Sequence, residues 1–244
     1  MIRFWRSCQI VFCFILFGLG AAVISFIIFP YISLTKPKEK QKKYYAEVIH
    51  TAWHWFQRDL QRIGLIKINI ANSERLNNLS GKIIIANHPT FVDIVILIGL
   101  IPNSTCFAKK ETLKNPFFRN IVKSIYIIND IDVEKLKTDT DKFLKEGFNI
   151  IIFPSGTRTK PDEDFKVHKG PALISLNSNA EIVPIKITTD YVFLQKGQPI
   201  YDIGDKTVNY NLDVKPSINP SDYADLGDIK ARNHISQLIK NEII

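Results

Sequence analysis

The sequence is poor in cysteine, because its 244 residues include only Cys8, Cys13 and Cys106. Cys8 and Cys13 lie in an apolar stretch near the N-terminus, and Cys106 is far from both. This spacing excludes a disulfide framework and does not match a zinc site. We therefore expect a reduced, cytoplasmic domain without a bound metal.

The sequence also lacks a basic excess over most of its length, although its formal net charge is +8. Residues 1–80 contain 11 Lys and Arg against four Asp and Glu, whereas residues 81–244 contain 21 against 20. A nucleic-acid-binding protein places its basic residues on the folded domain. We therefore expect no nucleic-acid partner, and the basic N-terminal part suits an anionic lipid surface instead.

Charge is absent altogether from residues 8–29, "CQIVFCFILFGLGAAVISFIIF". As a helix, these residues would be about 33 Å long, and the core of a bilayer is about 30 Å thick. A cleaved signal peptide and a buried helix of a soluble domain are the alternatives. A signal peptide has a shorter apolar region and a small-residue cleavage site, whereas "PYISLTKPKEK" follows here. The lysines on this C-terminal side predict a cell (inner) membrane protein whose catalytic part faces the cytoplasm.

A second helix is predicted over residues 40–63, where Trp53 and Trp55 lie among basic side chains. Such aromatic residues favour the headgroup layer. One crossing helix with one interfacial helix, or two helices that both enter a single leaflet, fit this pattern equally well. The predicted division is a membrane anchor over 1–63 and a folded domain over 64–244.

Beyond the polar stretch at 72–81, apolar runs of strand length alternate with helical patterns. The predicted strands are 82–86, 105–110, 126–128, 148–154, 181–187, 199–203 and 207–215. The predicted helices are 90–100, 115–125, 132–147, 170–179 and 228–241. This alternation predicts the α/β class, with a mostly parallel central sheet flanked by helices.

Polar residues gather where three of the predicted strands end, in "NHPTFVD", "KKE" and "SGTRTK". Ligands of open α/β sheets bind beyond the carboxyl ends of the strands. In the first cluster, His88 precedes a helix that contains Asp93. The ring can fold back over the helix start, so that the carboxylate orients one ring nitrogen and leaves the other as a general base.

No covalent nucleophile accompanies this base. Ser155 lacks the glycine two residues before it that a nucleophile elbow requires. A base without a nucleophile suits direct attack by a substrate hydroxyl on an activated acyl group, and a thioester fits because a thiol is a good leaving group.

A second set of residues is suited to binding phosphate. Arginine forms forked hydrogen bonds to phosphate oxygens, and Arg158 follows Gly156 and Thr157 in the third cluster. Lys109 and Lys110 can add positive charge. An acceptor that carries both a hydroxyl and a phosphate is therefore expected.

Four blocks in this order resemble the glycerolipid acyltransferases, the group that includes 1-acylglycerol-3-phosphate acyltransferase. The blocks are "NHPTFVD", "FAKKETLKNPFF", "FPSGTRT" and "IVPIKI". The resemblance implies a catalytic pair, acceptor contacts in the second block, a phosphate-binding third block and a proline beside the substrate channel. These roles fall on His88 and Asp93, on Lys109 or Lys110, on Gly156, Thr157 and Arg158, and on Pro184.

The resemblance implies a membrane-anchored O-acyltransferase of phospholipid biosynthesis. The acyl group would pass from an acyl-CoA or acyl carrier protein thioester, a co-substrate rather than a cofactor, to a lysophospholipid. With 1-acylglycerol-3-phosphate as the acceptor, the product is phosphatidic acid. Ser155 stands where the family has Glu, and Arg119 where it has Gly. A catalytically silent lipid-binding protein of the same fold and a lipid ester or thioester hydrolase are the alternatives.

Overall fold

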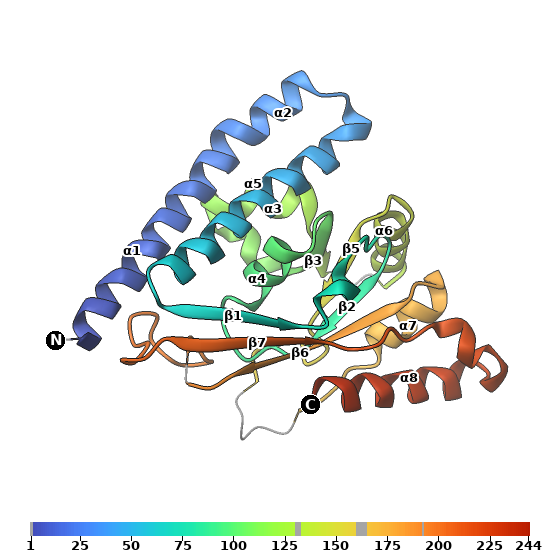
Figure 1. The fold of residues 1–244 in the computed structure, drawn as a ribbon. Helices are drawn as coiled ribbons and strands as arrows, with labels where there is room; N and C mark the ends of the chain where they lie inside the picture. Colours follow the sequence, from blue (N-terminus) through green and yellow to red (C-terminus); the bar gives the residue numbers. More distant parts are fainter. Residues whose placement is uncertain (1, 130–132, 160–164, 192) are drawn as a thin grey trace.

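The protein, a computed structural model that describes residues 2–129, 133–159, 165–191 and 193–244, is built on one seven-stranded sheet between two layers of helices (Figure 1). The strands are β1 (Ile66–Ala71), β2 (Ile83–Ala86), β3 (Ser104–Lys109), β4 (Ile127–Asn129), β5 (Asn149–Ile152), β6 (Ile182–Thr189) and β7 (Val208–Val214). Their order in the sheet is β1-β7-β6-β2-β5-β3-β4. The five strands from β6 to β4 are parallel, and β7 is antiparallel to β6 but parallel to β1. The predicted α/β fold with a mostly parallel sheet is confirmed.

The helices cover both faces of the sheet, with α3, α4 and α5 on one side and α7 and α8 on the other (Figure 1). Their bounds are α1 (Ile2–Val23), α2 (Phe29–Thr35), α3 (Lys38–Arg62), α4 (Asp93–Leu100), α5 (Pro116–Ile125), α6 (Val133–Lys145), α7 (Gly170–Ser178) and α8 (Asp228–Ile243). Short 3-10 helices η2 (Ser73–Leu76), η3 (Lys110–Lys114) and η4 (Pro220–Leu226) lie in the connections.

Strand β2 forms the middle of the core. Ile83, Ile84 and Ile85 are all fully buried, because β2 pairs with β5 on one side and β6 on the other while helices cover both faces. A strand buried on both faces is apolar along its whole length. Polar residues can therefore begin only where the chain leaves the sheet, after Ala86.

The N-terminal helices form a long hairpin against the domain. A π-helical segment, η1 (Ile24–Ile28), joins α1 to α2, and α3 returns beside them (Figure 1). The hairpin is attached at two levels. The Arg6 guanidinium donates to the carbonyl oxygens of Gly64 and Lys206, at 3.2 and 2.6 Å, and the Asn120 side chain donates to the Ser25 carbonyl at 3.1 Å.

Helix α3 is fixed in turn to α4 at a close approach. His50 Nδ1 and His54 Nδ1 lie 2.8 and 3.0 Å from the carbonyl oxygens of Ile98 and Gly99. A Cβ on Gly99 would lie 2.8 Å from the backbone nitrogen of His54, so no larger residue fits there without displacing α3. The two histidines thus hold one helix against another.

Two expectations for the strands differ from the structure. The predicted strand at 199–203 is wrong, because the segment forms a turn in which the Asp202 N–H donates to the Pro199 carbonyl at 3.0 Å and Ile200 is exposed. Strand β1, at the edge of the sheet, is not among the predicted strands. Its residues, "IKINIA", pair with β7.

Candidate active site

The chain leaves β2 through an anchored residue, Asn87. Its side-chain nitrogen donates to the Ile187 carbonyl at 2.7 Å, and its side-chain oxygen accepts from the Ile187 N–H at 2.6 Å. The amide therefore takes the place of a backbone ladder partner for β6. This double hydrogen bond fixes the direction in which the next residue, His88, leaves the sheet.

His88 lies at the carboxyl edge of the sheet, where two contacts orient its ring and one holds its backbone. Nδ1 lies 2.7 Å from Oδ2 of Asp93, and the ring stacks on Phe153 with centroids 4.0 Å apart and planes 12° apart. The Thr159 N–H donates to the His88 carbonyl at 3.0 Å. The side chain is 17% exposed. The Asp93 bond uses Nδ1, so Nε2 is the nitrogen that can accept a proton.

Asp93 is the first residue of α4, and its side chain is completely buried. Oδ2 also accepts from the Thr90 N–H at 2.8 Å, and Oδ1 accepts from the Thr90 hydroxyl and, at 2.5 Å, from the Tyr210 hydroxyl. A carboxylate has about four acceptor positions, and four donors occupy them here. The positive end of the α4 dipole adds to this stabilisation.

The Tyr210 hydroxyl acts only as a donor in this cluster. Burial raises its pKa well above the ordinary value for tyrosine, and the neighbouring Asp93 charge raises the pKa further. The hydroxyl therefore keeps its proton throughout the physiological range.

Arg158 is held beside the turn that carries His88. Its Nη1 donates weakly to the carbonyl oxygens of Leu194 and Gln195, at 3.4 and 3.3 Å, and its guanidinium lies 5.5 Å from the centroid of the Phe91 ring. The Phe91 N–H also donates to the Leu194 carbonyl, at 2.9 Å. An arginine has five N–H groups, so this arrangement orients Arg158 and leaves donors for an anion.

The loop after β5 turns sharply at Gly156, whose φ of +68° is a conformation that L side chains rarely adopt. The Ser155 hydroxyl donates to the Thr157 carbonyl at 2.7 Å, and the Thr157 side chain is exposed. The Ser155 hydroxyl therefore stabilises the turn. Cys106 offers no alternative nucleophile, because burial raises its pKa to about 12.

The structure brings some of the predicted site residues together and places others apart. His88 and Asp93 are in contact, and the Gly156–Arg158 turn follows β5, the neighbour of β2. Lys109 ends β3, two strands and about 10 Å from β2, and both it and Lys110 are exposed. Pro184 is a buried residue of β6, level with Ile85 and inside the sheet.

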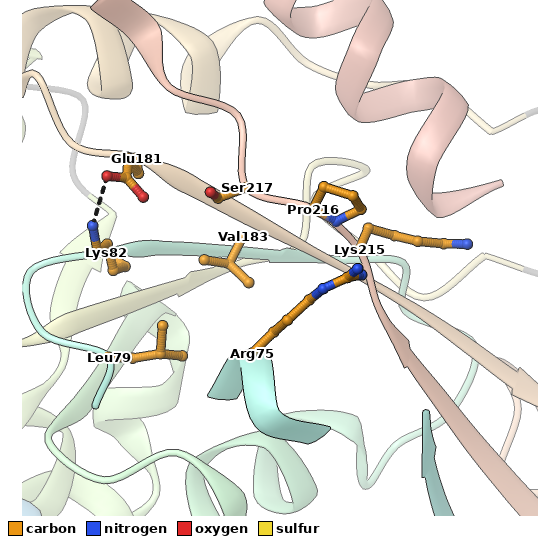
Figure 2. Close-up of a pocket in the computed structure, with 8 residues that line it drawn as sticks. All are labelled: Arg75, Leu79, Lys82, Glu181, Val183, Lys215, Pro216 and Ser217. Atoms are coloured by element: carbon orange, nitrogen blue, oxygen red, sulfur yellow. Dashed lines mark ion pairs between the residues drawn. The ribbon is translucent and has the colours of Figure 1, made fainter. Parts of the chain in front are cut away.

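A hollow of about 410 Å³ lies at the other edge of the sheet, where β2 and β6 begin (Figure 2). Its lining includes Arg75, Lys82, Glu181 and Lys215. The charges are paired: Lys82 Nζ lies 2.9 Å from a Glu181 carboxylate oxygen, and Lys215 Nζ lies 2.7 Å from Asp213. The hollow is separated from His88 by the length of β2.

Sequence reasoning missed two parts of the site, Tyr210 and the Leu194–Gln195 carbonyls. Strand β7 alternates buried and half-buried residues, which puts Tyr210 on its buried face, and a buried tyrosine hydroxyl requires a partner. The alternation along this strand therefore indicates Tyr210 as a buried residue that needs a polar partner. The carbonyls of residues 194 and 195 carry no signal in their side chains. Within the described ranges, no group of three or more His, Cys, Asp or Glu could hold a metal.

Known proteins resemble this chain in sequence and in fold. The 1-acyl-sn-glycerol-3-phosphate acyltransferase of Bacillus subtilis (strain 168) is 35% identical over 124 residues, which are 48% of this chain and 60% of that protein. The enzyme of the same name from Cocos nucifera is 31% identical over 159 residues, 61% of this chain and 50% of that protein. The chain thus spans about half to 60% of the length of these two curated relatives.

A solved structure shares the fold. The crystal structure of the 1-acyl-sn-glycerophosphate (LPA) acyltransferase PlsC from Thermotoga maritima aligns with a TM-score of 0.77 and 19% identity, over 99% of this chain and 95% of that one. A sequence model described as Acyltransferase matches residues 67–188, half of the chain. The resemblance found in the four blocks is confirmed, and the chain belongs to the Acyltransferase family.

Proposed function

We propose that this protein is an O-acyltransferase that moves a fatty acyl group from a thioester to the hydroxyl of 1-acylglycerol-3-phosphate, giving phosphatidic acid. The observation that carries the proposal is the His88–Asp93 pair, in which a buried carboxylate binds Nδ1 and leaves Nε2 at the sheet edge. The names of the relatives support the same reaction. The donor is acyl-CoA or an acyl carrier protein thioester, with no further cofactor.

The reaction requires one base and no covalent intermediate on the enzyme. Nε2 of His88 takes the proton of the acceptor hydroxyl while the oxygen attacks the thioester carbonyl carbon. The tetrahedral oxyanion then collapses, the C–S bond breaks, and the leaving thiolate takes the proton from the imidazolium. Asp93 stabilises the imidazolium during this sequence, as a carboxylate does in hydrolase triads.

The acceptor phosphate binds the turn after β5 in this proposal. Arg158 supplies a charge and N–H donors to which no described residue is bonded, and the backbone of the Gly156 turn lies exposed beside it. Lys109 and Lys110, two strands away, would act on a more distant part of the substrates. Fixing the phosphate also fixes the distance between the acceptor hydroxyl and Nε2.

The hairpin of α1, α2 and α3 is proposed to lie in one leaflet of the membrane. Ile2–Thr35 is, among the described residues, one helix long and apolar enough to cross a bilayer by length and composition. However, α3 runs back beside it, and nine of the 25 residues of α3 are charged. A crossing by the first helix would carry these charges through the bilayer, at about 2.5–3.5 kcal/mol each.

The exposed face of the hairpin supports this orientation. Large apolar side chains are exposed along α1, η1 and α2, among them Phe12, Leu19 and Phe26. The Phe14 ring contacts Phe91, three residues after His88, with centroids 5.9 Å apart. The active site is therefore next to the surface that would enter lipid. In this proposal the domain lies on the cytoplasmic face of the cell membrane, as the lysines that follow residue 29 favour.

The direct test is an assay of products. The purified protein, in vesicles that contain phosphatidylglycerol, receives a radiolabelled acyl thioester with or without 1-acylglycerol-3-phosphate. Labelled phosphatidic acid that appears only with the acceptor supports the proposal. Free fatty acid at the same rate with and without acceptor would make the protein a hydrolase, and no turnover with either donor would leave a lipid-binding role.

A further inference from the structure

Tyr210 reaches the catalytic cluster from outside the four sequence blocks and outside the segment that the family model matches. It lies in β7, where it pairs with Thr189 of β6 and Ile68 of β1. Because β7 is antiparallel to β6, the beginning of β7 lies at the edge where β6 and the other parallel strands end. The topology thus places Tyr210 at the carboxyl edge of the sheet, the same edge from which the turn that carries His88 leaves.

The contact between Tyr210 and the site is specific. The hydroxyl donates to Oδ1 of Asp93 at 2.5 Å, and the side chain is completely buried. Oδ2 is shared by His88 and the Thr90 N–H. The two carboxylate oxygens are therefore divided between two tasks, because one is fixed to the scaffold and the other faces the imidazole.

We propose that Tyr210 is a positioning residue for the acyl transfer, whose hydroxyl fixes Oδ1 of Asp93 so that Oδ2 stays aligned on Nδ1 of His88. The inference rests on the proposed function and deepens it. The other donor to Oδ1, the Thr90 hydroxyl, cannot anchor Asp93 to the rest of the domain. Thr90 belongs to the same turn as His88, and this turn is the segment whose position has to be fixed. Tyr210 connects the pair to a strand of the sheet, and strands hold side chains more precisely than loops do.

The test is Tyr210→Phe, which removes the hydroxyl and keeps the ring. We expect kcat for acyl transfer to fall by about 10-fold, with the KM of the thioester and of the acceptor unchanged within about twofold, because neither substrate touches this side chain. The matched control is Tyr126→Phe, which removes the hydroxyl of a half-buried tyrosine near Trp53 rather than near Asp93. The control keeps the kcat of the unmodified protein.

A double-mutant cycle separates positioning from general stability. In a His88→Ala background, Tyr210→Phe should cause no further loss of the residual rate, because Tyr210 acts only through the imidazole. An equal loss in both backgrounds, a rise in KM, or an unchanged kcat would overturn the inference. A second variant, Thr90→Val, removes the other hydroxyl donor to the same Oδ1, so its kcat should also fall while both KM values stay within about twofold.

The experiment distinguishes this inference from the proposed function. If the unmodified protein forms no phosphatidic acid from either donor, the proposed function fails and the role of Tyr210 in transfer fails with it. If the unmodified protein is active and Tyr210→Phe is equally active, only the inference about Tyr210 fails. A Tyr210→Phe protein that did not fold would show the hydroxyl to be structural, and Thr90→Val would then decide whether tethering Oδ1 matters for kcat.

Discussion

The two ends of strand β2 both carry a pair of ionisable side chains, but the pairs differ in burial. At the carboxyl end, Asp93 is completely buried and accepts four hydrogen bonds. At the amino end, Lys82 and Glu181 lie 2.9 Å apart with side chains 28% and 37% exposed (Figure 2). The Asp93 carboxylate has no access to water and the His88 side chain is 17% exposed, whereas the Lys82–Glu181 pair shares its charges with solvent.

The difference in burial decides what each pair can do. Solvent and salt screen an exposed ion pair, and such pairs contribute about 0–1 kcal/mol. A buried carboxylate needs all its donors, so its geometry is fixed, and it holds a partner ring in one orientation. This contrast supports the proposal that catalysis takes place at the carboxyl end, and it gives the pair at the amino end only a small contribution to stability. The following predictions test this contrast.

The largest effect is expected for His88→Ala. Removal of the imidazole leaves the acceptor hydroxyl without a base, so kcat for phosphatidic acid formation should fall by at least about 10²–10⁴-fold. The circular dichroism spectrum and the binding to vesicles should stay unchanged. Transfer at the unmodified rate would remove His88 from the reaction.

The next effect concerns the apolar face of the hairpin. Leu19 is 60% exposed on α1, and Leu19→Lys should weaken the partition into vesicles by about 10²-fold, since a lysine inside the apolar layer costs about 2.5–3.5 kcal/mol. Sedimentation with vesicles measures this. The matched control is Ile229→Lys on α8, 67% exposed on the other side of the sheet. Equal losses in both variants would contradict the proposed orientation.

A smaller and more selective effect is expected for Arg158→Ala. Loss of one charged hydrogen-bonding group costs about 1.5–3 kcal/mol, so the KM of the phosphorylated acceptor should rise by about 10- to 100-fold. The KM of the thioester should change by less than about threefold. Steady-state kinetics with each substrate varied in turn gives both values. A parallel rise in both would argue against phosphate recognition by Arg158.

The smallest effect is expected at the amino end of β2. Lys82→Met breaks an exposed ion pair, so kcat should stay within about twofold and the free energy of unfolding should fall by less than about 1 kcal/mol. Thermal or urea unfolding and the transfer assay measure these quantities. A loss of activity comparable with that of His88→Ala would show that the two ends of the strand are coupled.

Much of the domain was predictable because its parallel strands carry their own signals. Apolar runs such as "KIIIA" and "FNIIIFP" read as buried strands, and polar residues at their ends marked the site. The His88–Asp93 contact followed from the break between the strand and α4. His88 and Asp93 are only five residues apart, so their contact depends on local sequence.

The remaining features depend on pairing between distant segments. Strand β7 runs antiparallel to β6 and pairs with the edge strand β1 on its other side. No local sequence pattern indicates the direction in which β7 runs. The position of Tyr210 against Asp93, 117 residues away, follows from that direction. The carbonyls that orient Arg158 belong to the backbone, so residue type does not reveal them.

His88 is proposed to serve the reaction by taking a proton from the acceptor hydroxyl. An acceptor in which a thiol replaces that hydroxyl tests this role most directly, because a thiol with a pKa near 8.5 supplies its own thiolate near neutral pH. The rates with both acceptors are compared in the unmodified protein and in His88→Ala, after subtraction of the rate with heat-denatured protein. We expect His88→Ala to lose transfer to the hydroxyl by at least about 10²-fold and to keep transfer to the thiol within about 10-fold. Equal losses with both acceptors would contradict the role of His88 as the base.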